Sequence, residues 1–236
     1  MKLYSGDLSP YSARVRMQIY AKGLEAQIPL ERPATFGTAK FREEHPIGRI
    51  PVLDIDGDMM PESEVIAEYL EEIFPTPSML GATPRETAHI RTVARIGDIY
   101  IMNNMFMLSP QSRAKTRNEG IVELLGGQVV RNVKALDKFI GKDGFACSGR
   151  VTMADCALVP GLFLVENVLP TTGVENPIPK NANVAAYWAA IQKNEFAAKV
   201  LVELYRGLEE RREMIRNGTF AKMMAANAAA LAAAQN

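Results

Sequence analysis

The feature that most limits the fold is a change in hydrophobic periodicity near residue 75. Before it, short apolar runs alternate with amphipathic segments, whereas after it every long segment has the spacing of an amphipathic helix. The stretch FPTPSMLGATP carries three prolines at this change. Proline and glycine at such a point are typical of a linker. We therefore expect domains at residues 1–75 and 85–236, joined by a linker at residues 76–84.

The first part of the chain predicts the element order β-α-β-α-β-β-α. Asp56-Gly57 favours a tight hairpin turn, and Pro29 suits an edge strand. Strands are expected at residues 2–5, 26–30, 49–55 and 56–60, and helices at residues 10–23, 38–44 and 62–74. The last helix would place one apolar face toward the core, made of Val65, Ile66, Tyr69, Leu70 and Ile73.

After residue 84 the chain predicts an all-helical domain, so the fold class is α/β followed by all-α. Helices are expected at residues 85–108, 113–140, 152–168, 182–193 and 195–217. Thr152 and Asp155 have the spacing of a capping box at the start of one of them. The alanine-rich tail favours a helix but offers little to bury, and the sequence leaves its role open.

Charge and hydropathy exclude several kinds of partner. Acidic and basic residues balance at 27 each, which gives no electrostatic reason to expect nucleic acid or an anionic membrane. No apolar run reaches the roughly 18 residues of a membrane span, and the start MKLYSGD lacks the apolar core of a signal peptide. We expect a cytoplasmic protein with neither nucleic acid nor membrane as a partner.

Cysteine and histidine are scarce. Cys147 and Cys156 lack the CxxC spacing and are expected to be buried thiols in a reducing compartment. His45 and His89 are too few and too scattered to predict a metal site. The sequence therefore predicts no metal.

Three short motifs each allow a structural and a functional interpretation. Ser9 before Pro10 is typical of a helix N-cap, and its hydroxyl is either only that cap or a group placed for chemistry. Pro51, inside an apolar strand, fits an edge strand or a backbone exposed to a ligand. Glu62-Ser63 lies where a helix begins. The pair is either a capping serine with an acidic neighbour or part of a helix N-terminus that binds a carboxylate.

Four stretches, in this order and spacing, resemble the cytosolic glutathione transferases: SPYSARVRMQIYAKGLE, PIGRIPVLDIDG, PESEVIAEYLEEIFP and SGRVTMADCALVP. The resemblance implies a thioredoxin-like N-terminal domain, a helical C-terminal domain and a homodimer. It also implies glutathione as co-substrate and a small hydrophobic electrophile as its partner.

The resemblance implies roles for residues around the glutathione. Pro51 would be cis, and Ile50 would pair its backbone with the cysteinyl part, as an added strand does. Glu62 would face the ammonium of the γ-glutamyl end, and Ser63 would hold its carboxylate. Where many relatives carry a lysine for the glycine carboxylate, this chain has Gly37. Two basic residues remain as candidates or as solvated surface, Lys40 and Arg49.

The electrophile pocket is implied in the helical domain. The stretch RIGDIYIMNNMFMLSP has a methionine-rich face that fits ordinary core packing or, in the family, the wall of a plastic apolar pocket. The pocket candidates are Tyr11 of the N-terminal domain and, in this stretch, Tyr100, Asn103, Asn104 and Met107.

A glutathione transferase needs a thiolate near neutral pH, although a free thiol has a pKa of about 8.5. In serine-type relatives a hydroxyl at Ser9 would face the sulfur beside the positive end of a helix. Tyr11, Ser12 and Tyr4 are reserve hydroxyls. Omega-like relatives carry cysteine at this place, and this chain has none in its first 146 residues. That departure argues against thiol–disulfide exchange.

The sequence thus predicts an enzyme that activates glutathione for conjugation, ether cleavage or dehalogenation. Two alternatives remain. One is a non-catalytic regulatory or scaffold protein of this fold, although such a protein need not keep Ser9 and Glu62-Ser63. The other is a glutathione-dependent isomerase or peroxidase that uses the same site.

Overall fold

The computed structural model describes residues 1–233, and the side chains of residues 1–229. The chain forms two compact units: the first runs from Met1 to Leu70 and resumes at Val202, and the second runs from Glu71 to Leu201. The sequence predicted a boundary at the proline-rich linker of residues 76–84. In the structure, the segment from Val202 onward belongs to the first unit, because Arg206 and Gly207 contact the loop between residues 4 and 10.

The first unit is built on a four-stranded sheet in the order β2-β1-β3-β4. The strands are β1 (Lys2–Tyr4), β2 (Leu30–Glu31), β3 (Val52–Ile55) and β4 (Asp58–Pro61). β1 pairs with β2 in parallel and with β3 antiparallel, and β3 pairs with β4 antiparallel. The paired Leu3 and Leu53 are fully buried, so this register places the core at the centre of the sheet.

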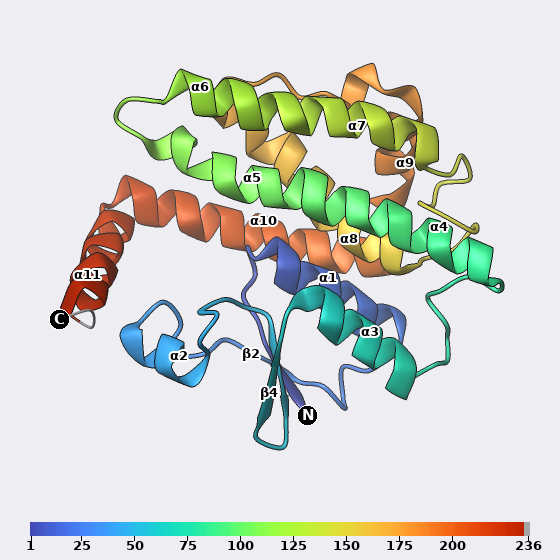
Figure 1. Cartoon of the computed structure of the whole chain (residues 1–236), viewed down its shortest axis with the longest axis horizontal. Helices are drawn as coiled ribbons and strands as arrows, with labels where there is room; N and C mark the ends of the chain where they lie inside the picture. The colour runs from blue at the N-terminus through green and yellow to red at the C-terminus, as the bar shows by residue number, and fades with distance from the viewer. Residues whose placement is uncertain (234–236) are drawn as a thin grey trace. The chain divides into compact units, whose positions relative to one another are not determined.

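Three helices accompany the sheet: α1 (Pro10–Ala21), α2 (Ala39–Glu44) and α3 (Ser63–Ile73). Figure 1 shows α2 on one side of the sheet and α1 with α3 on the other. The Gln18 amide donates to the Ala67 carbonyl over 2.8 Å, and this buried bond joins α1 to α3. The predicted order β-α-β-α-β-β-α and the thioredoxin-like fold class are confirmed.

The hairpin turn is also confirmed. Asp56 and Gly57 connect β3 to β4 with φ angles of +54° and +100°. Both angles lie in the left-handed region, which the favoured two-residue hairpin turns require. The Gly57 N–H is held by the Asp54 carboxylate at 2.8 Å.

Two predictions in this unit were wrong in detail. The strand expected at residues 26–30 is confined to Leu30–Glu31, because the N–H groups of Gln27 and Ile28 bond back to the Leu24 carbonyl. On α3 the buried apolar residues are Ile66, Ala67 and Leu70. Of the face that the sequence predicted, Val65 and Ile73 are exposed and Tyr69 is only half-buried, because the helix presents Ala67 to α1.

The second unit is helical, as predicted. Its elements are α4 (Pro84–Arg95), η1 (Ile96–Met102), α5 (Asn103–Leu108), η2 (Ser109–Arg113), α6 (Glu119–Ile121), η3 (Val122–Gly126), α7 (Gly127–Phe139), α8 (Met153–Asn167), η4 (Leu169–Thr172), η5 (Ile178–Lys180) and α9 (Ala182–Ile191). α8 is buried from Met153 to Val165 and packs against α4 and η1. The Thr152–Asp155 capping box is confirmed at its start.

The two long helices expected at residues 85–108 and 113–140 are interrupted. η1 and η3 are π-helical turns, in which hydrogen bonds span one residue more than in an α-helix. At Gly97, a Cβ would lie 3.0 Å from a Leu158 methyl on α8, so η1 lies very close to α8. The second helix begins only at Glu119, where Asn118 caps it.

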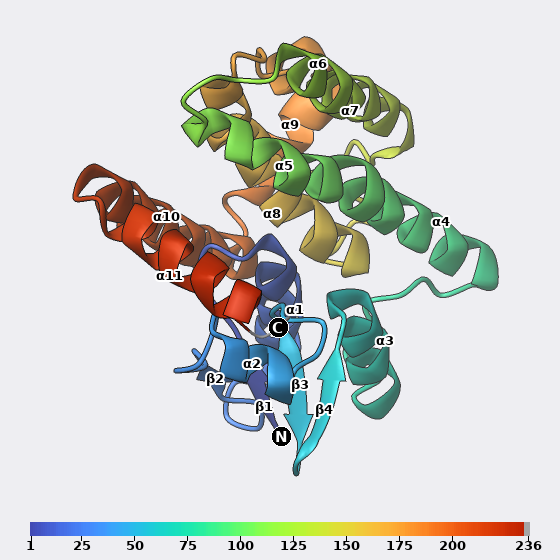
Figure 2. The same cartoon turned by 60° about the vertical axis from the view of Figure 1, so that its left-hand side comes forward.

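The chain ends in α10 (Glu195–Arg216) and α11 (Thr219–Ala233). The alanine-rich tail is therefore helical as far as Ala233, the last described residue. It contacts α2 in the first unit, where a Cβ at Gly37 would lie 3.4 Å from the Asn227 amide nitrogen. Figures 1 and 2 both show α11 beside α2.

Candidate active site

Ser9 ends the loop that follows β1 and caps α1. Its Oγ accepts a hydrogen bond from the Ser12 N–H at 3.2 Å, and Pro10 occupies the first turn, so the predicted cap is confirmed. The Ser9 Oγ also donates to the Ile50 carbonyl oxygen over 3.5 Å, the outer limit of a hydrogen bond. Ser9 therefore holds the helix start through its lone pair, while its proton is only weakly engaged.

The Ile50–Pro51 peptide bond is cis, as the family resemblance implied. Ile50 is half-buried beside Ser9, and Pro51 is buried at the start of β3. A Cβ at Gly6 would lie 2.9 Å from the Ile50 Cδ1, so the loop before α1 passes tightly over this bend. The bend thus brings the Ile50 backbone and the Ser9 hydroxyl together.

Glu62 and Ser63 start α3, as predicted. Glu62 is exposed with a φ of +73°, an uncommon conformation for a residue that is not glycine, and its carbonyl accepts the Ile66 N–H. Ser63 is buried, and its Oγ accepts from Arg14 at 3.4 Å. Arg14 also forms a 2.6 Å ion pair with Glu64. The helix start is therefore fixed from α1.

The two basic candidates lie in different settings. Lys40 is exposed on α2 and pairs weakly with Glu44 at 3.8 Å. Arg49 is exposed and borders a shallow hollow that Pro61 and His45 also line. Of these lining residues, Pro61 directly precedes Glu62 in the chain. A contact of either with glutathione stays a prediction.

The reserve hydroxyls are separated by burial. Tyr11 is half-buried in the first turn of α1, whereas Ser12 is fully buried. The Ser12 Oγ has no hydrogen-bond partner among the described residues. Tyr4 lies in β1, and its ring contacts the His45 ring edge-on at 5.7 Å. Burial therefore separates only Ser12, because Tyr4 is half-buried like Tyr11; of the two, Tyr11 lies in the same helix turn as Ser9.

The electrophile candidates of the second unit divide into two sets. Met102 and Met105 are buried core residues, whereas Tyr100, Asn103 and Met107 are exposed and Asn104 is half-buried. The Asn104 amide donates to the Tyr100 carbonyl at 2.8 Å. Core packing thus accounts for the two buried methionines. The electrophile contact stays a prediction.

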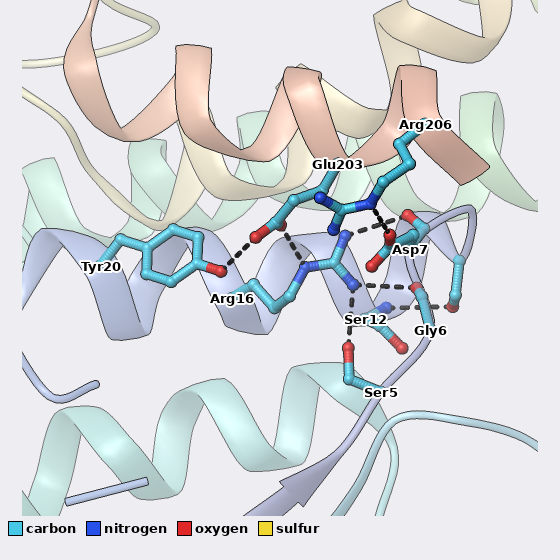
Figure 3. A network of polar contacts seen from close by, with 9 residues as sticks. Ser5, Gly6, Asp7, Ser12, Arg16, Tyr20, Glu203 and Arg206 are labelled. Carbon is cyan, nitrogen blue, oxygen red and sulfur yellow. Dashed lines mark hydrogen bonds and ion pairs between the residues drawn. The ribbon is translucent and has the colours of Figure 1, made fainter. Parts of the chain in front are cut away.

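Two buried arginines were missed by the sequence reasoning. Arg14 and Arg16, on α1, are 2% and 1% exposed. Arg16 pairs with Glu203 at 2.7 Å, and Figure 3 shows its guanidinium directed into the loop that leads to Ser9. Two arginines in a helix that contains no acidic residue are a sequence signal that could have predicted ion pairs with distant parts of the chain. Their acidic partners lie 50 and 187 positions away.

The cysteines are unsuited to nucleophilic chemistry. Both are buried, and burial raises the pKa of the Cys147 thiol to about 12, with the Asp155 and Asp143 carboxylates adding to the shift. A thiol with this pKa stays protonated near neutral pH. Within residues 1–233, no three acidic, histidine or cysteine side chains gather as a metal site. Over the same range, no helix has the length and apolar character to cross a bilayer.

Comparison with known proteins gives a family match and relatives. Residues 3–78 match the family model of the N-terminal domain of glutathione S-transferase. A maleylacetoacetate isomerase of Pseudomonas aeruginosa is 32% identical over 173 residues, covering 70% of this chain and 82% of that protein. A stringent starvation protein A homolog of Coxiella burnetii is 29% identical, covering 75% and 79%.

The fold has solved counterparts. A glutathione S-transferase of Methylobacterium radiotolerans, in complex with glutathione sulfonate, superposes with a TM-score of 0.73 at 19% identity. The likeness covers 84% of this chain and 93% of that one. At this identity the comparison shows the fold alone.

Proposed function

Because the chain belongs to the glutathione transferase family, we propose that it binds glutathione in its first unit and activates the thiolate for attack on a small hydrophobic electrophile. The observation that carries the proposal is the Ser9 hydroxyl, which caps α1 and lies beside the cis Ile50–Pro51 bend. The cap places this hydroxyl at the positive end of a twelve-residue helix.

Ser9 would stabilise the thiolate by donating its proton to the sulfur. That proton is held only by the 3.5 Å contact with the Ile50 carbonyl, so little is lost when it turns to a bound anion. A hydrogen bond to the charged form and a helix N-terminus both favour ionisation of a thiol. Together they would bring the glutathione pKa from about 8.5 toward neutrality.

Binding would rest on the start of α3 and on β3. Arg14 contacts the Ser63 Oγ at 3.4 Å and pairs with the neighbouring Glu64 at 2.6 Å, so the helix start that would receive the carboxylate of the γ-glutamyl end is anchored to α1. Glu62 is exposed and acidic, which suits the ammonium beside that carboxylate. The Ile50 backbone would pair with the cysteinyl part.

A second candidate reaction is isomerisation, favoured by the relative named maleylacetoacetate isomerase. The thiolate would add to a cis double bond conjugated with a carbonyl, the resulting single bond would rotate, and elimination would expel the thiolate. Glutathione is consumed in conjugation but regenerated here. Its concentration during turnover therefore separates the two reactions.

The test begins with glutathione binding by calorimetry, followed by turnover on a panel of electrophiles that includes a maleyl compound. For Ser9→Ala we expect binding within about twofold and kcat lower by about 10-fold, as for the loss of one or two kcal/mol of thiolate stabilisation. Glu62→Ala should lose binding instead. Tyr11→Phe and Ser12→Ala are the matched hydroxyl controls.

Each result has a consequence. A larger kcat loss in Tyr11→Phe than in Ser9→Ala would move the catalytic role to Tyr11. If the wild type binds no glutathione, the proposal of a glutathione-dependent enzyme is excluded. The regulatory alternative, suggested by the starvation protein homolog, then takes its place.

We also propose that the enzyme is a cytoplasmic homodimer. The family resemblance supports the dimer, and the two free cysteines fit a reducing compartment. Light scattering of the purified protein tests the dimer, because a monomer at micromolar concentration would contradict it.

A further inference from the structure

The loop between β1 and α1 is held by one buried side chain. Arg16 Nη1 donates to the Ser5 Oγ and to the Gly6 carbonyl, each at 2.8 Å, and Nη2 donates to the Asp7 carbonyl at 3.0 Å (Figure 3). The Gly6 carbonyl also accepts the Ser9 N–H at 3.0 Å. A single carbonyl therefore links the guanidinium to the backbone of Ser9.

The guanidinium is itself oriented from α10. Glu203 Oε2 accepts from Arg16 Nε at 2.7 Å, and its Oε1 accepts from the Tyr20 hydroxyl at 2.5 Å. Burial and this bond raise the pKa of Tyr20, so the phenol remains a donor over the working pH range. Both carboxylate oxygens are engaged, which fixes the plane in which Arg16 meets the loop.

α10 also touches the loop directly. Arg206 Nε pairs with the Asp7 carboxylate at 2.6 Å, and a Cβ at Gly207 would lie only 2.6 Å from the Leu8 nitrogen. Residues 203, 206 and 207 share one helix face, since they are three and four positions apart. That face requires glycine at position 207 for the loop to lie where it does.

We propose that Arg16, oriented by Glu203, is a positioning residue that sets the direction of the Ser9 hydroxyl toward the glutathione sulfur; the inference rests on the proposed function. Arg16 acts through Gly6 and touches neither substrate. A buried ion pair is seldom needed for stability, since apolar side chains of similar volume serve as well. Here, however, three of the guanidinium bonds end within four residues of Ser9.

The test measures the pKa of bound glutathione from the ultraviolet absorbance of its thiolate as a function of pH. Arg16→Lys keeps the charge but loses the planar fork. We expect the thiol pKa to rise by about one unit and kcat to fall about 10-fold, with glutathione affinity within about threefold. Circular dichroism checks that the variant is folded.

Arg14→Lys is the matched control, because Arg14 is equally buried on the same helix and also ion-paired. Since its bonds go to Ser63 and Glu64, we expect weaker glutathione binding and an unchanged thiol pKa. A merely structural role of Arg16 would make the two variants behave alike. That result would overturn the inference.

A double-mutant cycle tests whether Arg16 acts through Ser9. In a Ser9→Ala background, Arg16→Lys should raise the thiol pKa no further, and a full additional rise would overturn the inference. If Arg16→Lys does not fold, Glu203→Gln decides: a rise of about half a pKa unit supports the inference, and no rise refutes it.

The two proposals fail in different ways. A thiol pKa in Arg16→Lys that equals the wild-type value, together with a raised one in Ser9→Ala, would remove the positioning role alone. A thiol pKa that Ser9→Ala does not change would remove both, because Ser9 would then not hold the sulfur.

Discussion

At the scale of single residues, Ser9 shows how a structural and a chemical role share one side chain. Its lone pair satisfies the Ser12 N–H at the helix start, and as a donor its Oγ has only a weak contact, 3.5 Å from the Ile50 carbonyl oxygen. A hydroxyl can do both because it accepts and donates at once. The helix cap therefore does not compete with thiolate stabilisation, and it fixes the place from which the proton is given.

Asp155, in the second unit, gives a pH-dependent prediction. Burial raises the pKa of this carboxyl to about 6, although the N–H groups of Ala146 and Thr152 and the Thr152 hydroxyl oppose the shift. The folded protein then keeps a proton that the unfolded chain releases near pH 4. The free energy of unfolding should fall as pH rises from about 4 to about 6, by roughly 3 kcal/mol in total from this group.

Urea unfolding followed by the fluorescence of Trp188, the only tryptophan of the chain, measures this effect between pH 4.5 and 7.5. The stability difference between wild type and Asp155→Asn should shrink or reverse as pH rises. Glu123→Gln, at an exposed position of the same unit, should run parallel to wild type. Parallel profiles for Asp155→Asn as well would show that the carboxyl does not titrate in this range.

At the scale of elements, two glycines with free space around them should respond oppositely to alanine. A Cβ at Gly57 or at Gly127 meets nothing within 4 Å. Gly57 has a φ of +100° in the β3–β4 turn, whereas Gly127 has a helical φ of −61° in α7. Gly57→Ala should lower the free energy of unfolding by about 1–2 kcal/mol. Gly127→Ala should raise it by up to about 1 kcal/mol.

Thermal unfolding of both variants against wild type tests the pair. Since neither site has a side chain to repack, the difference isolates the backbone conformation. A loss of similar size at both positions would mean that the hairpin angles of Asp56 and Gly57 do not limit stability.

The elements were predictable where local pattern decides them. The periodicity change predicted a mixed first part and a helical remainder, and Asp56-Gly57 predicted the hairpin. The π-helical turns η1 and η3 were not predictable from periodicity, and each contains a glycine in close contact with a distant residue: Gly97 with Leu158 of α8, and Gly126 with Val174. The buried face of α3 was misplaced because it depends on how α3 packs on α1, where the Ala67 carbonyl accepts from the Gln18 amide.

The candidate site was predictable in part. The cap at Ser9 followed from serine before proline, and the cis bond at Pro51 followed only from the family resemblance. Arg14 and Arg16 were missed because arginine is rarely buried unless paired. The pairing of Arg16 with Glu203 spans 187 positions, which no local pattern records.

At the scale of the whole molecule, the first unit needs the end of the chain. A chain shortened to residues 1–201 would leave Arg16 buried without Glu203, and removing one partner of a buried pair costs about 3–5 kcal/mol. We expect it to bind no glutathione and to show a broad unfolding transition. A chain of residues 1–216 keeps Glu203, Arg206 and Gly207 and should bind.

Calorimetry and circular dichroism on the two shortened chains distinguish the cases. Glutathione binding by residues 1–201 at wild-type affinity would show that the sheet, α1 and α3 hold the loop without α10. If the chain of residues 1–216 also fails to bind glutathione, binding would require α11, which contacts α2.

The union of residues 1–70 with the segment from Val202 onward also sets an order of events in the cell. Ribosomes release the N-terminus first, at about 5–20 residues per second. The loop before Ser9 therefore leaves the ribosome about 200 residues ahead of Glu203 and Gly207. A nascent chain can form its sheet early, but it cannot complete the environment of Ser9 until translation is nearly finished. Ribosomes stalled before Glu203 would display a chain without an assembled site.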